Sequence, residues 1–139
     1  MIPKFRAWDK ELQTMLDVSL IDFKKGVLVG EHWEFGETNF MNFDEIVLMQ
    51  STGLKDKNGQ EIFEGDIVKR DGIKRPEVVR FGEWIDVDSL GYKEQYIGFY
   101  FESEHEGQEW LHSVEPQFNH LYKIIGNIYE NPELLEVEG

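Results

Sequence analysis

The run MQSTGLKDKNGQEIFEGDIVKR, from Met49 to Arg70, constrains the fold most because it places two turn signals within one short stretch of chain. Asp56, Asn58 and Gly59 suit a type I turn followed by a left-handed residue. The Asp56 carboxylate can accept backbone N–H groups there, and Gly59 adopts a positive φ without steric cost. A two-residue turn centred on Asn58-Gly59 is the alternative, and it would shift the strand register by one residue. Either turn predicts a β-hairpin without any ligand.

The second turn signal is Gly65-Asp66, which separates two apolar stretches and predicts a sharp corner before the strand-like residues Ile67 to Arg70. The alternative makes Asp66 an acid or a metal ligand, joined by Asp56 or Glu64. Because an aspartate in a turn usually binds its own backbone, we interpret Asp66 as a structural residue.

Short apolar stretches bounded by turn signals continue along the chain and predict a mainly β protein. Residues 96–102 alternate in polarity, and we expect Ile97, Phe99 and Phe101 to face the core. Residues 30–42 show no clear period and are expected to be irregular. Residues 82–95 are acidic and predict a long loop or a ragged hairpin.

Three further local signals concern helical turns and a bulge. A short helix that starts at Asn42 or Asp44 is an alternative to a strand there. Gly126 indicates a β-bulge or a close backbone approach. Asn131 before Pro132 predicts a capping residue and a single helical turn over residues 133–136.

The composition is that of a folded chain, with 40% hydrophobic and 14% aromatic residues. The chain has no cysteine, which excludes disulfides, thiolate metal sites and cysteine nucleophiles. We see neither a signal peptide nor an apolar stretch that would span a bilayer, and we expect a soluble, cytoplasmic protein.

The charge is strongly acidic, with 28 Asp and Glu residues against 14 Lys and Arg residues and a formal net charge of −14. Such a charge repels phosphate backbones, so nucleic acid is disfavoured as a partner. An acidic protein that imitates DNA is the alternative interpretation. A local basic patch comprises Lys69, Arg70, Lys74 and Arg75, and we interpret it as the solvated tip of a hairpin.

Three blocks of the sequence resemble the YopX-like family of phage and prophage proteins. They are the KFRAWD block (Lys4 to Asp9), the block from Leu48 to Val68, and the IIGNIYENPELL block (Ile124 to Leu135). Because the blocks lie at both ends and in the middle, the resemblance extends over nearly the whole chain.

The resemblance implies a largely β protein of phage or prophage origin, present in the cytoplasm of a bacterial host, with no established activity. It implies a small β-barrel of the SH3-type (an SH3-like fold) at 51–139. An N-terminal β lobe at 1–50 would pack on this barrel, and a short helical turn would lie at the C-terminus. One continuous domain over 1–139 is the alternative. No catalytic residue can be carried over from the family.

Four histidines raise a metal hypothesis: His32, His105, His112 and His120. His105 and His112 lie among glutamates, and histidine with carboxylates suits zinc, manganese or iron. Their spacing matches none of the usual helical ligand pairs. We therefore expect no metal and no cofactor, and His105 and His112 are the candidates to test.

Aromatic residues near variable segments give a candidate partner surface, comprising Trp33, Phe35, Trp84, Tyr92 and Trp110. The alternative, which we favour, is that these rings fill the core between two small β layers.

No nucleophile elbow or glycine-rich phosphate loop occurs, so the common enzyme classes are unsupported. Our leading hypothesis is a non-enzymatic module that binds a protein partner or assembles with itself as a homo-oligomer. The alternatives are an acidic DNA-mimicking effector against a host DNA-binding protein, and a metal-dependent hydrolase that uses His105 and His112.

Overall fold

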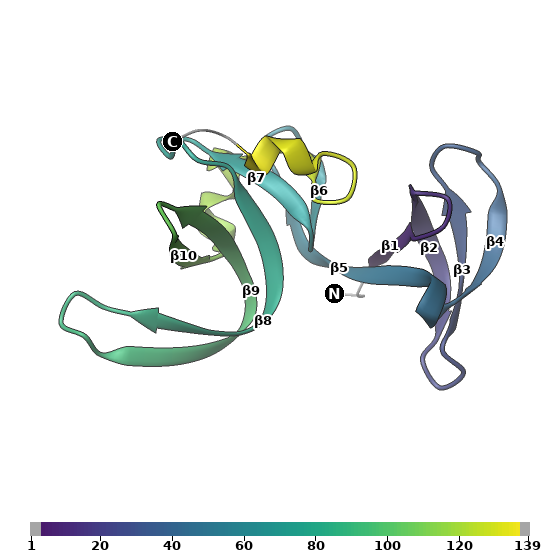
Figure 1. The fold of residues 1–139 in the computed structure, drawn as a ribbon, viewed down its shortest axis with the longest axis horizontal. Coiled ribbons are helices and arrows are strands. Elements are labelled where there is room, and N and C mark those ends of the chain that lie inside the picture. Colours follow the sequence, from purple (N-terminus) through teal and green to yellow (C-terminus); the bar gives the residue numbers. More distant parts are fainter. Residues whose placement is uncertain (1–3, 137–139) are drawn as a thin grey trace. The chain divides into compact units, whose positions relative to one another are not determined.

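The computed structural model describes residues 4–136 and confirms a mainly β chain (Figure 1). The strands pair antiparallel and form two sheets. The chain divides into two compact units, the first ending at Gly53 and the second beginning at Leu54. This boundary falls within the strand β5, so one strand contributes to both units.

The first unit is a small antiparallel sheet. Its elements are β1 (Phe5–Asp9), β2 (Thr14–Asp22), β3 (Val27–His32), β4 (Thr38–Asn42), the 3-10 helix η1 (Phe43–Glu45) and β5 (Ile46–Lys55). The strand order is β4-β3-β2-β1-β5, and β6 (Glu61–Phe63) follows β5. The buried side chains of its core are Ala7, Leu16, Leu28, Met41 and Ile46.

The expectation of irregular structure at 30–42 is wrong, because the segment contains the end of β3 and the whole of β4. Met41 of β4 pairs with Leu28 of β3 and is buried beside it. The alternation of apolar and polar residues that marks a strand is not visible in β4, because its exposed position 40 is occupied by an aromatic residue, Phe40. After β4, η1 has no side-chain cap: the Asn42 amide donates to the Glu45 carboxylate instead.

The second unit contains the longest strands. Its elements are β6, β7 (Asp66–Arg70), β8 (Glu77–Val87), β9 (Lys93–His105), β10 (Gln108–Ser113), the 3-10 helix η2 (Pro116–Leu121), β11 (Tyr122–Asn127) and the 3-10 helix η3 (Pro132–Leu135). The strand order is β10-β9-β8-β7-β11. The buried core side chains are Ile62, Val68, Val79, Phe101 and Tyr122. Within residues 4–136 no strand pairing joins β10 to β11, so pairing does not close this sheet.

The turn between β5 and β6 has the hydrogen bonds of a type I turn followed by a left-handed glycine. Gly59 donates to the Asp56 carbonyl at 3.0 Å and has a φ of 81°. The Asp56 carboxylate is buried and accepts the N–H groups of Asn58 and Gln60, each at 2.9 Å. Its other oxygen accepts the N–H of Ile124 in β11 at 3.0 Å. The turn is therefore fixed locally and also anchored to a distant strand.

The corner at Gly65-Asp66 likewise uses its carboxylate for the backbone. Asp66 is buried and accepts the Phe63 N–H at 2.8 Å. Gly65 donates to the Val79 carbonyl at 2.7 Å and accepts from the Ile128 N–H at 2.9 Å. The corner thus connects β8 with the segment after β11.

The C-terminal part of the described chain contains a bulge and a short helix. The pairing of β11 with β7 shifts between Ile124 and Gly126. As expected, Asn131 is the N-cap residue of η3 and Pro132 begins the helix. The Asn131 side chain makes no capping bond, because its oxygen accepts the Asn127 N–H at 3.2 Å. Of the helices in the described chain, none is long and apolar enough to cross a membrane.

Candidate functional site

The most distinctive surface of the second unit is a two-stranded ribbon, residues 81–99, made by the parts of β8 and β9 that extend beyond the other strands (Figure 1). Strand β7 pairs with β8 at Glu77 and Val78, and Gly65 adds one bond at Val79. On the other side, β10 pairs with β9 from Tyr100 onward. Within the described residues, the ribbon strands therefore have no strand beside them other than each other.

One face of the ribbon, which we call the apolar face, carries the five apolar residues Phe81, Ile85, Val87, Ile97 and Phe99, together with the polar residues Glu83, Lys93 and Gln95. Ile97 is 74% exposed, and the rings of Phe81 and Phe99 contact edge to face with centroids 4.8 Å apart. The expectation that Ile97 belongs to the core is wrong: only Phe101 of the expected set is fully buried, since β9 leaves the core before it reaches Ile97. An exposed apolar face of this kind does not stabilise a monomeric protein in water, and contiguous patches of this sort mark interaction sites.

The opposite face, which we call the acidic face, carries an aromatic stack and two carboxylates. Trp84 is only 6% exposed and stacks on Tyr96 and Tyr100, with centroids 5.0 and 5.7 Å apart. Asp86 and Glu94 follow on the same face and are direct cross-strand partners. Like charges placed directly opposite each other destabilise a sheet.

The negative charge of the acidic face affects the pKa of Tyr96, whose hydroxyl donates a hydrogen bond to the Glu94 carboxylate. This hydrogen bond is the main cause that raises the pKa of Tyr96, and slight burial and the negative charges of Glu94 and Asp86 act in the same direction. Asp86 is exposed, and none of the hydrogen bonds or ion pairs among the described residues includes its carboxylate.

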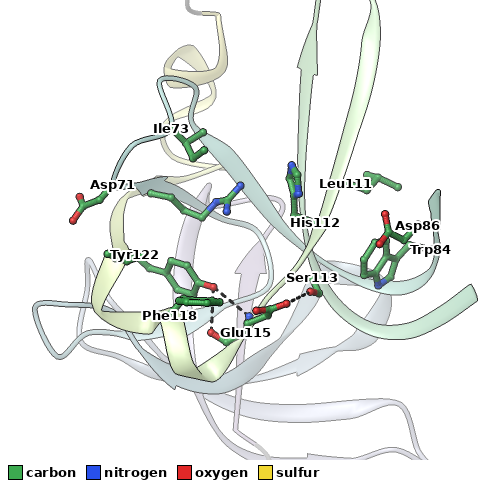
Figure 2. A pocket seen from close by; sticks show the side chains of 12 residues that line it. Asp71, Ile73, Trp84, Asp86, Leu111, His112, Ser113, Glu115, Phe118 and Tyr122 are labelled. Atoms are coloured by element: carbon green, nitrogen blue, oxygen red, sulfur yellow. Dashed lines mark hydrogen bonds between the residues drawn. The ribbon is translucent and has the colours of Figure 1, made fainter. Parts of the chain in front are cut away.

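Beside the acidic face lies a cavity of about 420 Å³ (Figure 2). It is lined by Arg70, Asp71, Ile73, Trp84, Asp86, Leu111, His112, Ser113, Glu115, Phe118, Leu121 and Tyr122. Arg70 forms a two-pronged ion pair with the buried Glu77, one contact measuring 3.0 Å, and its guanidinium lies 5.2 Å from the Phe101 ring centroid. The arginine charge is therefore already compensated by the protein.

Tyr122 lines this cavity and is buried. Its hydroxyl donates to the Glu115 carbonyl and accepts the Glu115 N–H, both at 3.2 Å (Figure 2). Burial raises the pKa of Tyr122, partly offset by the bond with Glu115 and by the Arg70 charge. Because both hydrogen-bonding functions of the hydroxyl are used inside the protein, Tyr122 is a structural residue of the cavity rather than a proton donor to a ligand.

A second polar cluster lies in the first unit around His32, which is 2% exposed. The Asn39 amide donates to Nδ1 of His32 at 2.9 Å, so Nε2 carries the proton and donates to Asp9 at 2.9 Å. The other Asp9 oxygen accepts the N–H groups of Glu11 and Leu12, each at 3.0 Å. Burial alone would raise the pKa of Asp9, but the bonds from His32, Leu12 and Glu11 outweigh it and lower that pKa.

The histidine side chains that the structure describes lie apart from one another. His112 lies on β10 at the cavity, whereas His32 is held by Asp9 and Asn39 in the first unit. The side chain of His105 lies outside the described residues. Among the side chains that are described, no group of three His, Asp or Glu residues is placed to hold a metal ion. His105 and His112 belong to the paired strands β9 and β10 of a hairpin.

The predicted aromatic surface is divided by the fold. Trp33 and Phe35 are exposed in the first unit, where the Trp33 indole donates to Asp17 at 2.8 Å. Tyr92 and Trp110 are exposed in the second unit, but Trp84 is buried. The preferred interpretation as core rings therefore describes Trp84 alone. Residues 82–95 belong to the hairpin of β8 and β9, the second of the two structures expected for them. The sequence signal that was missed is that Phe81, Ile85 and Val87 lie on one face of β8, with Glu83 between them.

Taken together, these surfaces define a β-rich protein of two units, with a projecting two-faced ribbon in the second. The family described as YopX protein matches residues 4–136, so the chain belongs to the YopX family, which confirms the resemblance. The chain is also similar to the crystal structure of protein EF1440 from Enterococcus faecalis, with 30% identity and a TM-score of 0.51. That match covers 97% of this chain and 99% of EF1440. A search of curated proteins found no match.

Proposed function

We propose that this chain is a phage or prophage accessory protein that acts in the bacterial cytoplasm without enzymatic chemistry. It serves as a protein-interaction module, and the ribbon is its docking surface. In this proposal the second unit is a relative of SH3-type barrels that is extended by the ribbon. The phage origin follows from the resemblance stated above.

The observation that carries the proposal is the apolar face of the ribbon, whose five apolar side chains include four exposed hydrophobic residues on two paired strands. Burying an exposed aliphatic or aromatic side chain contributes about 1.5–3 kcal/mol. A partner that covers this face therefore gains a substantial part of the free energy that association requires.

The test compares capture of host-lysate proteins by three forms of the whole chain. The ribbon variant carries Ile85→Thr and Ile97→Thr, which keep β-branched side chains in the strands. The matched control carries Leu20→Thr and Phe40→Thr, which remove equally exposed apolar residues from the first unit. We expect the wild type and the control to retain the same protein and the ribbon variant to lose it.

Light scattering separates a foreign partner from self-assembly. A dimeric mass that the ribbon variant loses identifies a second copy as the occupant, which is also an interaction function. Equal capture by all three forms would refute the ribbon as the docking surface. Failure to recover any protein, together with a monomeric mass, would refute the proposed function.

A further inference from the structure

The ribbon has an open strand edge. The outer edge of β8, which faces away from β9, is followed by β7 only as far as Val78, with one further bond at Val79. From Phe81 to Val87 no described strand lies beside it. An open edge presents unpaired backbone donors and acceptors that can pair with an extended segment of another chain.

A strand added at this edge would point its side chains alternately to the two ribbon faces. Those on one side would extend the apolar face next to Phe81, Ile85 and Val87. Those on the other side would lie next to Trp84 and Asp86, which also line the cavity. The two faces therefore demand different residue types at alternate positions of the added strand.

No ion pair among the described residues includes Asp86 or Glu94, and Arg80, on the same side of β8, is paired with Glu102 at 3.6 Å. Asp86 and Glu94 face each other across the ribbon, and the only lysine or arginine lining the described cavity, Arg70, is already paired with Glu77. A lysine or arginine placed over Asp86 and Glu94 would turn a repulsive carboxylate pair into two favourable contacts. Phe118, which lines the cavity and is 45% exposed, offers a ring beside which a cationic stem can pack.

A second copy of this chain is a poor occupant for the same reason. Residues 81–99 contain four acidic residues and one lysine, and the whole chain has a net charge of −14. Two such ribbons placed edge to edge would bring like charges together, whereas a cationic partner is complementary.

Building on the proposed function, we infer that the partner contributes an extended, positively charged segment that adds to the outer edge of β8. Its apolar residues alternate with lysine or arginine. The apolar side chains join the ribbon's apolar face, and the basic side chains lie over Asp86 and Glu94 toward the cavity.

The experiment uses the whole chain and three synthetic peptides of typical strand length, about six residues. One alternates valine and lysine, a second alternates valine and glutamate, and a third has the valines and lysines in separate blocks. Affinity is measured by fluorescence anisotropy, and the site is located by amide hydrogen exchange. We expect only the alternating valine–lysine peptide to bind appreciably and to protect amides between residues 81 and 87.

Two charge variants locate the electrostatic contribution. The ribbon charge variant carries Asp86→Asn and Glu94→Gln, which remove both carboxylates of the acidic face. The control carries Glu34→Gln and Glu37→Gln, which change the net charge equally in the first unit. We expect the ribbon charge variant to bind the valine–lysine peptide about tenfold more weakly than the control.

Equal binding of the alternating and block peptides, equal weakening by both charge variants, or no protection of residues 81–87 would each overturn the inference. If the ribbon still captures a lysate protein while the peptide does not bind, the edge inference fails and the proposed function stands. If Ile85→Thr and Ile97→Thr leave lysate capture unchanged, the proposed function itself fails.

Discussion

At the scale of single residues, the buried aspartates Asp9, Asp56 and Asp66 accept hydrogen bonds from backbone N–H groups. Asp56 accepts three such bonds, and Asp9 accepts two in addition to its contact with His32. A hydrogen bond to a charged group contributes about 1.5–3 kcal/mol, roughly twice the value for neutral pairs. Because the pKa of Asp9 is lowered in the fold, an acid-sensitive part of the stability lies at Asp9.

Asp9 gives a pH-dependent prediction. Its pKa is lower in the folded chain than in the unfolded chain, so its ionised form stabilises the fold at neutral pH. That contribution is present above the unfolded pKa of about 3.9 and is lost as the pH falls through the lower folded value. We expect Asp9→Asn to reduce the free energy of unfolding at pH 7 and to flatten its decline in acid.

The measurement is urea unfolding of both forms at a series of pH values from neutral to about 3, monitored by tryptophan fluorescence. If the two stability curves stay parallel through the acid range, Asp9 is not one of the groups that link folding to protons.

At the scale of elements, the turns and bulges that depend on residues close together in the sequence could be predicted from it. The turn at Asp56–Gly59 depends on a carboxylate and a glycine within four residues, and Gly126 does lie at a bulge. The ribbon was not predictable in this way. Whether Ile97 or Trp84 faces the core depends on where β7 stops beside β8, which is a long-range pairing that no local pattern encodes.

The bulge in β11 supplies an element-scale prediction. A Cβ atom added at Gly126 would lie 2.5 Å from the Asn131 side-chain oxygen, far inside van der Waals contact. We expect Gly126→Ala to lower the free energy of unfolding by about 1–3 kcal/mol, the usual cost of overpacking. The same substitution should cost less when Asn131→Ala has already removed the obstructing group. Urea unfolding of the two single variants and the double variant measures this coupling, and strictly additive losses would rule out the clash.

At the scale of the whole molecule, the net charge of −14 acts against the compact state through self-repulsion. The same charge repels phosphate backbones and a second copy of the chain, and it underlies the proposed preference of the ribbon for a cationic segment. No single motif showed this preference. It follows from the composition together with the placement of Asp86 opposite Glu94.

Salt dependence tests the role of the whole charge. Raising the ionic strength from about 0.01 M to 1 M shortens the screening length from about 30 Å to about 3 Å. We expect the melting temperature to rise by several degrees in sodium chloride, since about 1 kcal/mol shifts it by roughly 2–8 °C in domains of this size range. Sucrose at matched osmolality is the comparison, because it does not screen charge. A melting temperature that falls with added salt would contradict this expectation.

The bond from the Ile124 N–H to the Asp56 carboxylate has a consequence for synthesis of the protein. Translation proceeds from the N-terminus, so Asp56 leaves the ribosome long before its partner does, and β7 likewise waits for β11. The hairpin of β8 and β9 is complete in that interval, because both strands precede Ile124. The residues of the ribbon have therefore left the ribosome before β11 can complete the second unit, and chaperones can meet their exposed apolar side chains while the protein is still being made.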